Sequence, residues 1–146
     1  MLESHVKRRS GKTEEIRKRQ ANIEPIQKAR LIAEAALDKK GEDIVIMDMR
    51  AVSNLTDYFV ISGAPSAKRV QAISEGIEEE LFKKGVKHGH IEGKKEALWV
   101  LIDYGDVIAH VFYGEMRDFY NIERLWHDAP KERLSPQCTS IKSKKT

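Results

Sequence analysis

Cysteine is nearly absent from the chain, which has only Cys138 among its 146 residues. One thiol cannot build a disulfide framework or a cysteine-based metal site within the chain, and this fits a reducing cytoplasm. Neither a bilayer-spanning apolar run nor a signal-peptide core is found. With 40% apolar and 34% charged residues, the composition predicts one soluble, cytoplasmic domain of ordinary size.

Motifs for common enzymatic chemistry are also missing. No Asp-x-Asp pair is present to hold magnesium, and the glycine–lysine loop that cradles phosphates is absent. Ser66 lacks the Gly-x-Ser-x-Gly setting of a nucleophile. His88, His90 and Glu92 alternate along a short strand, but three neighbours on one strand cannot surround a tetrahedral zinc ion, so a polar edge strand is favoured. The sequence predicts no catalytic residue, no cofactor and no metal.

Charge is unevenly distributed along the chain. Residues 1–20 hold seven basic and three acidic residues, and residues 131–146 hold five basic and one acidic residue. Because the whole chain has a net charge of only +3, the segment between these ends is acidic. A body that binds nucleic acid would be basic, so the acidic body suggests a basic protein surface as its partner. We expect a flexible basic extension (1–21), a folded domain (22–130) and a disordered basic tail (131–146).

Hydrophobic periodicity predicts an α/β domain with a mixed β-sheet flanked by helices. Pro25 suits the first turn of the first helix, Ser66 can cap the second, and Phe119 and Trp126 are interpreted as core residues of the third. Gly76 lies inside the second helix, where a close approach of the sheet could explain it. The expected helices are residues 22–40, 66–84 and 115–128, and the expected strands are residues 43–49, 58–62, 88–92, 98–102 and 107–112.

The hairpin formed by residues 98–112 is the centre of the sequence pattern. Both of its strands carry apolar residues on two faces, which is typical of interior strands covered by helices on each side. Gly105 suits a tight turn, and Asp103, Tyr104 and Asp106 are expected at its tip, where a partner could reach them. Turn chemistry alone also explains the two aspartates, and His110 is interpreted as a histidine satisfied within the sheet.

Aromatic residues and arginine gather around this hairpin. Trp99, Tyr104, Tyr120 and Arg117 have the composition of binding hot spots, although a core position is an equally good interpretation of Trp99. Surface recognition is therefore the function that the residues themselves favour.

Four segments, taken in order, resemble the ribosomal silencing factor family, also called Iojap. The resemblance extends from residue 26 to residue 128 and implies a nucleotidyltransferase-like fold without catalytic carboxylates. It also implies that the protein binds the large ribosomal subunit through ribosomal protein fourteen of that subunit. Binding there would sterically block subunit joining and repress translation under nutrient limitation, without catalysis. The segments are DMRAVSNLTDYFVISGAPSAKRVQAI, HIEG, LWVLIDYGDVIAHVF and RDFYNIERLW.

The resemblance also implies a set of partner-binding positions. Carboxylates among them would meet arginine or lysine of a basic ribosomal protein, while the aromatic residues would supply apolar area. The basic tails could add weak contacts to ribosomal RNA, a homodimer of the free protein is plausible, and no membrane contact is expected. Two alternatives stay open: a nucleotidyltransferase-like enzyme that uses Asp48 and Asp103, and a dimeric scaffold. The implied positions are Glu92, Trp99, Asp103, Tyr104, Asp106, His110, Arg117 and Tyr120.

Overall fold

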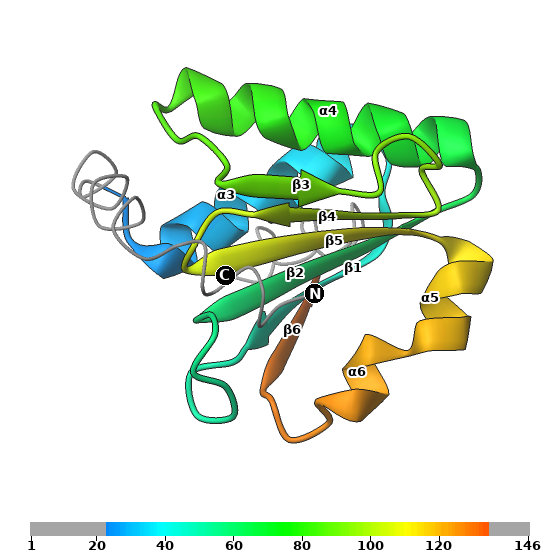
Figure 1. Ribbon diagram of the computed structural model, residues 1–146. Helices are drawn as coiled ribbons and strands as arrows, with labels where there is room; N and C mark the ends of the chain where they lie inside the picture. The colour runs from blue at the N-terminus through cyan, green and yellow to red at the C-terminus, as the bar shows by residue number, and fades with distance from the viewer. Residues whose placement is uncertain (1–22, 135–146) are drawn as a thin grey trace, which may run out of the picture.

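Six strands form one sheet in the order β3-β4-β5-β2-β1-β6 (Figure 1). The computed structural model describes residues 23–134, so the predicted extension 1–21 lies outside the described residues. Only β2 and β5 run parallel, and the other neighbouring strands are antiparallel, which confirms the prediction of a mixed sheet. The elements are α3 (Pro25–Asp38), β1 (Glu42–Asp48), β2 (Tyr58–Ala64), α4 (Ala67–Lys83), β3 (His90–Glu92), β4 (Trp99–Asp103), β5 (Val107–Tyr113), α5 (Gly114–Tyr120), α6 (Ile122–Leu125) and β6 (Lys131–Leu134).

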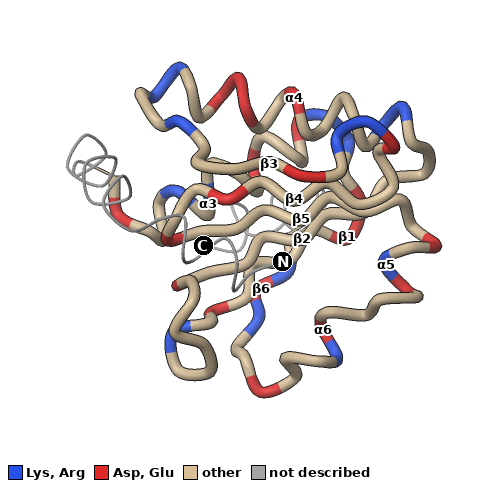
Figure 2. Tube along the Cα trace, in the orientation of Figure 1, with Lys and Arg blue, Asp and Glu red and all other residues tan. Residues whose placement is uncertain are grey.

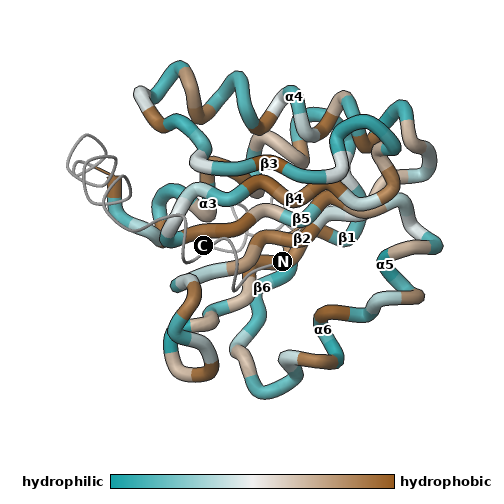
Figure 3. Tube along the Cα trace, viewed as in Figure 1, coloured by the Kyte–Doolittle hydropathy of each residue, from teal (hydrophilic) through white to brown (hydrophobic). Residues whose placement is uncertain are grey.

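One face of the sheet is covered by the two long helices, α3 and α4. The alanines of α3 are fully buried or nearly so, which lets the helix backbone approach the strands closely. Ile73 and Ile77 of α4 join the same core. Figure 3 shows apolar residues concentrated along the central strands, as expected for strands covered on both sides.

The opposite face carries a second, smaller core. Leu101 and Phe112 are among its buried residues, and Met116 of α5, Ile122 of α6 and Trp126 pack against it from the C-terminal part of the chain. Side chains of α5 and α6 therefore contribute to this face, which confirms the expectation of helices on both sides. Strands β2 and β5 carry no Lys, Arg, Asp or Glu, and Figure 2 shows the charges on the helices, the loops and the other strands.

Local signals explain how the two long helices begin. Pro25 occupies the first turn of α3, and the backbone N–H of Glu24 donates to Gln27 Oε1 at 3.2 Å. Ser66 caps α4, because its Oγ accepts a hydrogen bond from the backbone N–H of Arg69 at 3.1 Å. Both positions agree with the sequence prediction. Gly76 does allow a close approach, but the group that approaches it is the side chain of Lys39, just after α3, and not the sheet. A Cβ added at Gly76 would lie 2.8 Å from Lys39 Cγ.

The expected helix over residues 115–128 is wrong as a single element, because the chain breaks it at Asn121. This residue adopts the left-handed conformation, with φ 45°, and ends α5 there. Its Oδ1 then accepts from the backbone N–H of Arg124 at 3.3 Å and starts α6. Phe119, near the end of α5, is 76% exposed, so its prediction as a core residue is also wrong.

The predicted domain boundary at residue 130 falls too early. Residues 131–134 form strand β6, which pairs antiparallel with β1, and Arg30 of α3 donates both guanidinium ends to the carboxylate of Glu132 at 3.0 Å. Charged residues dominate β6, so no apolar alternation marks it in the sequence, and charges of this kind are common on edge strands. The rest of the predicted tail lies outside the described residues.

Candidate functional site: an aromatic series from core to surface

A continuous series of aromatic rings runs across strands β4 and β5 to the end of α5. The Trp99 ring stacks on Phe112, with centroids 5.0 Å apart and an interplanar angle of 24°. Trp99 also contacts Tyr120 of α5, with ring centroids 4.7 Å apart. Tyr120 in turn contacts Phe119 edge-on, with ring centroids 5.1 Å apart. Cross-strand and inter-element aromatic pairs of this kind stabilise the geometry of the surface that they form.

Exposure rises steadily along this series. Phe112 is buried, Trp99 is half-buried, Tyr120 is 48% exposed and Phe119 is 76% exposed. Large exposed aromatics that lean on a buried partner present apolar area at little cost in side-chain entropy. We call Trp99, Phe119 and Tyr120 the aromatic patch. The open interpretation of Trp99 is thereby resolved: between buried Phe112 and half-exposed Tyr120, it belongs partly to the core and partly to the surface.

The buried end of the series is held by a polar contact. Trp99 Nε1 donates a hydrogen bond to His110 Nδ1 at 3.1 Å, and the His110 ring packs edge-on against Phe59 with centroids 4.6 Å apart. His110 is only 2% exposed, and this burial lowers its pKa to about 3. His110 is therefore neutral over the physiological range and cannot itself touch a partner, contrary to its implied role as a contact.

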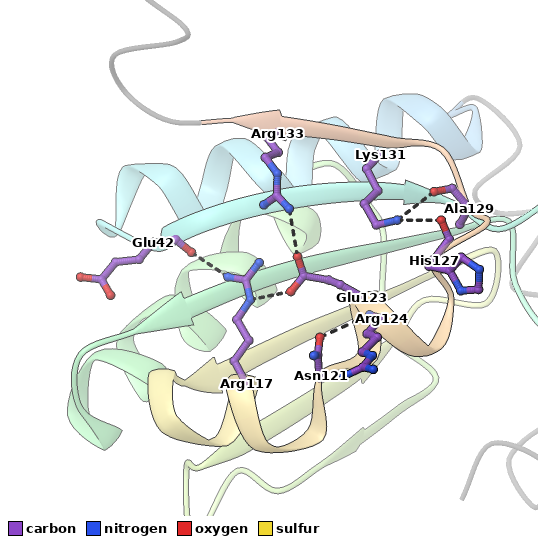
Figure 4. Close-up of polar contacts among 9 residues, drawn as sticks. All are labelled: Glu42, Arg117, Asn121, Glu123, Arg124, His127, Ala129, Lys131 and Arg133. Atoms are coloured by element: carbon purple, nitrogen blue, oxygen red, sulfur yellow. Dashed lines mark hydrogen bonds and ion pairs between the residues drawn. The ribbon is translucent and has the colours of Figure 1, made fainter.

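Arg117 places helix α5, and with it Tyr120 and Phe119. Its Nε donates to Glu123 Oε1 at 2.9 Å, and its Nη1 donates to the backbone carbonyl of Glu42 at 3.2 Å (Figure 4). Only 9% of Arg117 is exposed, so its implied role as a direct contact is replaced by a structural one. The guanidinium also lies against Gly63, where an added Cβ would be 3.3 Å from Nη1.

The carboxylate of Glu123 joins this network from the start of α6. Burial opposes its ionisation, but the hydrogen bond and positive charge of Arg117, together with Arg133, hold the pKa of Glu123 below its usual value. Figure 4 shows Arg133 of β6 reaching the same carboxylate, at 3.5 Å. Residues from β1, α5, α6 and β6 are thus joined through Arg117 and Glu123.

Glu92 lies on the same side of the sheet as Trp99. It pairs in register with Leu101, whose side chain belongs to the second core, and its Oε2 lies 2.6 Å from His90 Nε2. Its side chain is 36% exposed, so a partner can reach it. His88 instead faces Glu78 of α4 at 3.5 Å, and no metal-binding group of three appears within residues 23–134.

The tip of the hairpin differs most from the expectation. Asp103 is 1% exposed and its Oδ1 accepts from the backbone N–H of Gly105 at 2.6 Å, while Tyr104 is 3% exposed within the core under α3 and α4. Burial raises the pKa of Tyr104, and the nearby charge of Glu78 adds to this. Neither side chain lies where a partner could reach it, so both are corrected from surface to structural residues.

Asp106 is the least buried of the three expected tip residues, yet it is already engaged. Its Oδ1 lies 2.7 Å from the Nζ of Lys28, a lysine of α3 that is 2% exposed. Sequence reasoning missed Lys28, because a lysine beside an alanine stripe looks like a solvated helix residue. It also missed the exposure of Phe119, near the end of α5. Asn121 was the available signal for the end of that helix, since asparagine favours helix caps and left-handed backbone.

The geometry also bears on the enzymatic alternative. Asp48 and Asp103 are the last residues of β1 and β4, at the same end of the sheet. Strands β2 and β5 lie between β1 and β4, which places the two aspartates about 14 Å apart. Asp48 is bound by Arg50 through contacts of 2.9 and 2.6 Å, and this hydrogen bonding lowers the pKa of Asp48. Two such carboxylates cannot share one magnesium ion.

The fold and the site define a mixed α/β domain that exposes an aromatic patch beside its sheet. Residues 22–146 match the sequence model of a family described as "Ribosomal silencing factor during starvation". The chain belongs to this ribosomal silencing factor family, and the resemblance noted from its motifs is confirmed. The family name denotes a regulatory role in translation.

Among named relatives, the ribosomal silencing factor RsfS of Bacillus subtilis is 45% identical over 101 residues, which are 69% of this chain and 86% of the relative. RsfS of Halalkalibacterium halodurans is 41% identical over 71% of this chain and 89% of its own length. The chloroplastic protein Iojap of Zea mays is 33% identical over 67% of this chain, but only 42% of its own length is matched.

Solved structures agree with the fold. A crystal structure of a protein from Chromobacterium violaceum superposes with a TM-score of 0.70 at 33% identity, covering 72% of this chain and 88% of that one. A second, from Bacillus halodurans, gives a TM-score of 0.64 at 39% identity and covers 72% and 95%. These neighbours support the α/β fold, and the expected likeness to nucleotidyltransferases stays a prediction. Within residues 23–134, no helix is long and apolar enough to cross a membrane.

Proposed function

We propose that this chain represses translation by binding the large ribosomal subunit through ribosomal protein fourteen of that subunit. A bound factor would occupy the face that the small subunit must approach, and so would sterically block subunit joining under nutrient limitation. No reaction is catalysed in this proposal, and the protein acts in the cytoplasm. The observation that carries it is the tilted contact of half-buried Trp99 with half-exposed Tyr120, whose ring centroids lie 4.7 Å apart, beside the exposed Phe119.

The chemistry of this surface fits a ribosomal protein. Tryptophan and tyrosine are enriched among the hot spots of protein interfaces, and a surface of about 1,600 Å² suffices for tight binding when its anchors are good. Glu92 adds a carboxylate on the same side of the sheet for an arginine or lysine of the partner. Of the eight implied contacts, Glu92, Trp99 and Tyr120 remain candidates for direct contact, and Phe119 joins them.

Two matched phenylalanines allow a direct test. Phe119 on the aromatic patch is 76% exposed, and Phe82 at the end of α4 is 64% exposed. We expect Phe119→Ala and Tyr120→Ala to weaken co-sedimentation with purified large subunits by about tenfold or more. Phe82→Ala removes a similar exposed ring elsewhere and should bind as the parent protein does. Equal binding by all three variants would refute the aromatic patch as the docking surface.

The inhibitory step needs its own assay. Purified small subunits are added to large subunits preincubated with the protein, and the formation of whole ribosomes is followed by sedimentation. The proposal expects fewer whole ribosomes as the protein concentration rises, and Phe119→Ala should restore them. Undiminished joining in the presence of saturating, bound protein would show that binding does not exclude the small subunit.

Two further features extend the proposal. The basic ends, residues 1–21 and the residues after β6, could add weak, unspecific contacts to ribosomal RNA, which a strong dependence of binding on salt would reveal. The free protein could pair through the same exposed aromatics as a homodimer, since exposed apolar patches are common sites of self-association. A dimer that dissociates when Phe119 is replaced would support this pairing.

A further inference from the structure

We propose that His110 is a positioning residue, which holds the indole of Trp99 in the orientation that the aromatic patch presents to its partner. This inference rests on the proposed function, because it assigns a role within that docking surface. His110 is too deeply buried to meet a partner, with 2% of its surface exposed, so its influence on docking passes through the rings that it touches, of which Trp99 is the one hydrogen-bonded to it.

The two residues lie on neighbouring strands at the boundary between core and surface. Trp99 pairs in register with Phe112, and Leu101 pairs with His110, so the histidine lies diagonally across from the tryptophan. Two ring contacts, with Phe112 and Tyr120, position the plane of the indole. Ring contacts alone fix the plane of the indole, but they allow the indole to slide in that plane or to flip over and return to it. The bond from Trp99 Nε1 to His110 Nδ1, at 3.1 Å, selects a single orientation.

This bond also defines the tautomer of the histidine. Because Nδ1 accepts from the indole, a neutral ring carries its proton on Nε2. Within the described part of the chain, buried Nε2 has no hydrogen-bond partner. A buried donor without a partner lowers stability, and an aliphatic side chain among Phe59 and Phe112 would avoid that cost. Packing therefore does not explain a histidine here, whereas the need for an acceptor facing Trp99 does.

The contact has a consequence for what the partner meets. Nε1–H is the only hydrogen-bond donor of an indole, and His110 already uses it. Trp99 therefore offers a partner only its apolar rim, in a fixed orientation. A surface preorganised in this way loses less conformational freedom when it binds.

A pair of nearly isosteric substitutions separates the acceptor from the volume of the ring. His110→Asn keeps a carbonyl oxygen near the position of Nδ1, whereas His110→Leu has a similar shape and no acceptor. We expect His110→Leu to weaken association with purified large subunits by about three- to tenfold, the usual worth of one hydrogen bond. His110→Asn should stay within about twofold of the parent protein.

A spectroscopic readout tests the positioning directly and does not depend on the ribosome. The chain has two tryptophans, so the indole N–H resonances of Trp99 and Trp126 can be told apart with a Trp126→Phe variant. In His110→Leu, the Trp99 resonance should shift and its hydrogen exchange should become faster, while the Trp126 resonance stays unchanged. The denaturation midpoint of His110→Leu should not fall, because the substitution also removes a buried unpartnered donor.

A double substitution completes the test. In a Trp99→Phe background, replacing His110 by Leu should have no further effect on binding, because the bond is already lost. Equal binding of His110→Asn and His110→Leu, or additive losses in the double variant, would overturn the positioning role. If instead Trp99→Ala, Phe119→Ala and Tyr120→Ala all bind normally, the docking surface of the proposed function fails, and the inference fails with it.

Discussion

Lys28 of α3 meets Asp106, in the turn between β4 and β5, at 2.7 Å, although 78 positions separate the two residues in the chain. The lysine side chain is 2% exposed and the aspartate side chain 20% exposed, so this ion pair is largely shielded from water. It connects the first described helix to the central hairpin. The aspartate that the sequence suggested as a free surface charge is thus a tertiary contact.

Replacing Asp106 should therefore affect stability. We expect Asp106→Asn to lower the free energy of unfolding by about 2 kcal/mol, because it leaves a buried ammonium without its carboxylate; the partial exposure of Asp106 keeps the loss below that of a fully buried pair. Urea denaturation measures this change. Asp118→Asn removes an exposed carboxylate of α5 and should have almost no effect. Equal stability of the two variants would show that the pair contributes nothing.

Reversing the charge of Asp103 should damage the fold and not only the interface. Its carboxylate is buried and accepts from the backbone N–H of Gly105 at 2.6 Å, so Asp103→Lys would place an ammonium in a site shaped for an acceptor. We expect a loss of about 3 kcal/mol or more and poor recovery of folded protein.

Glu92→Lys provides the comparison for charge reversal, since its side chain is 36% exposed. This variant should keep most of the parent stability and weaken binding to large subunits. Circular dichroism on heating distinguishes the two variants. A stable, normally folded Asp103→Lys protein would contradict the structural role assigned to Asp103.

Acid should destabilise the protein over a pH range that is set partly by the pKa of His110. Burial lowers the pKa of His110 from 6.5 to about 3, so below pH 6.5 the unfolded chain takes up a proton that the folded protein does not. The contribution of neutral, buried His110 to the free energy of unfolding is fully present above pH 6.5 and is lost as the pH falls toward 3. The slope is at most about 1.4 kcal/mol per pH unit for one group.

Denaturation midpoints between pH 6.5 and 4 test this expectation. In His110→Asn the denaturation midpoint should fall less steeply as the pH is lowered. His127→Asn replaces a side chain that is 75% exposed, and its midpoint should fall as steeply as that of the parent protein. Identical pH profiles for the parent protein and His110→Asn would contradict a buried, neutral histidine.

Two truncations test the position of the domain boundary. Ending the chain after Pro130 removes β6, exposes the edge of β1 and breaks the contacts of Arg30 with Glu132. Ending it after Leu134 keeps these contacts. We expect the shorter protein to be the less stable of the two, by about 1–3 kcal/mol, and to aggregate more readily because its sheet edge is open. Equal stability of the two truncated proteins would show that the folded domain ends at residue 130, as the sequence predicts.

Much of this domain is encoded in local sequence. Pro25 and Ser66 mark helix starts by satisfying or removing backbone donors, and these effects need no tertiary partner. Strands 98–102 and 107–112 are apolar on both faces, which already places them inside a covered sheet. The family motifs lie in these same segments, so the amino-acid sequence alone indicates the fold class and the general role.

The accessibility of the candidate site was decided only by the tertiary structure. Aspartate and tyrosine in a turn look exposed in sequence, yet Tyr104 is buried in the core under α3 and α4, and Asp103 is buried between β3 and β5, the strands with which it pairs. Phe119 looks like a core residue in a continuous helix, yet the helix ends at Asn121 and Phe119 lies exposed. Residue type and spacing determine which elements form, whereas long-range packing determines which side chains remain for a partner.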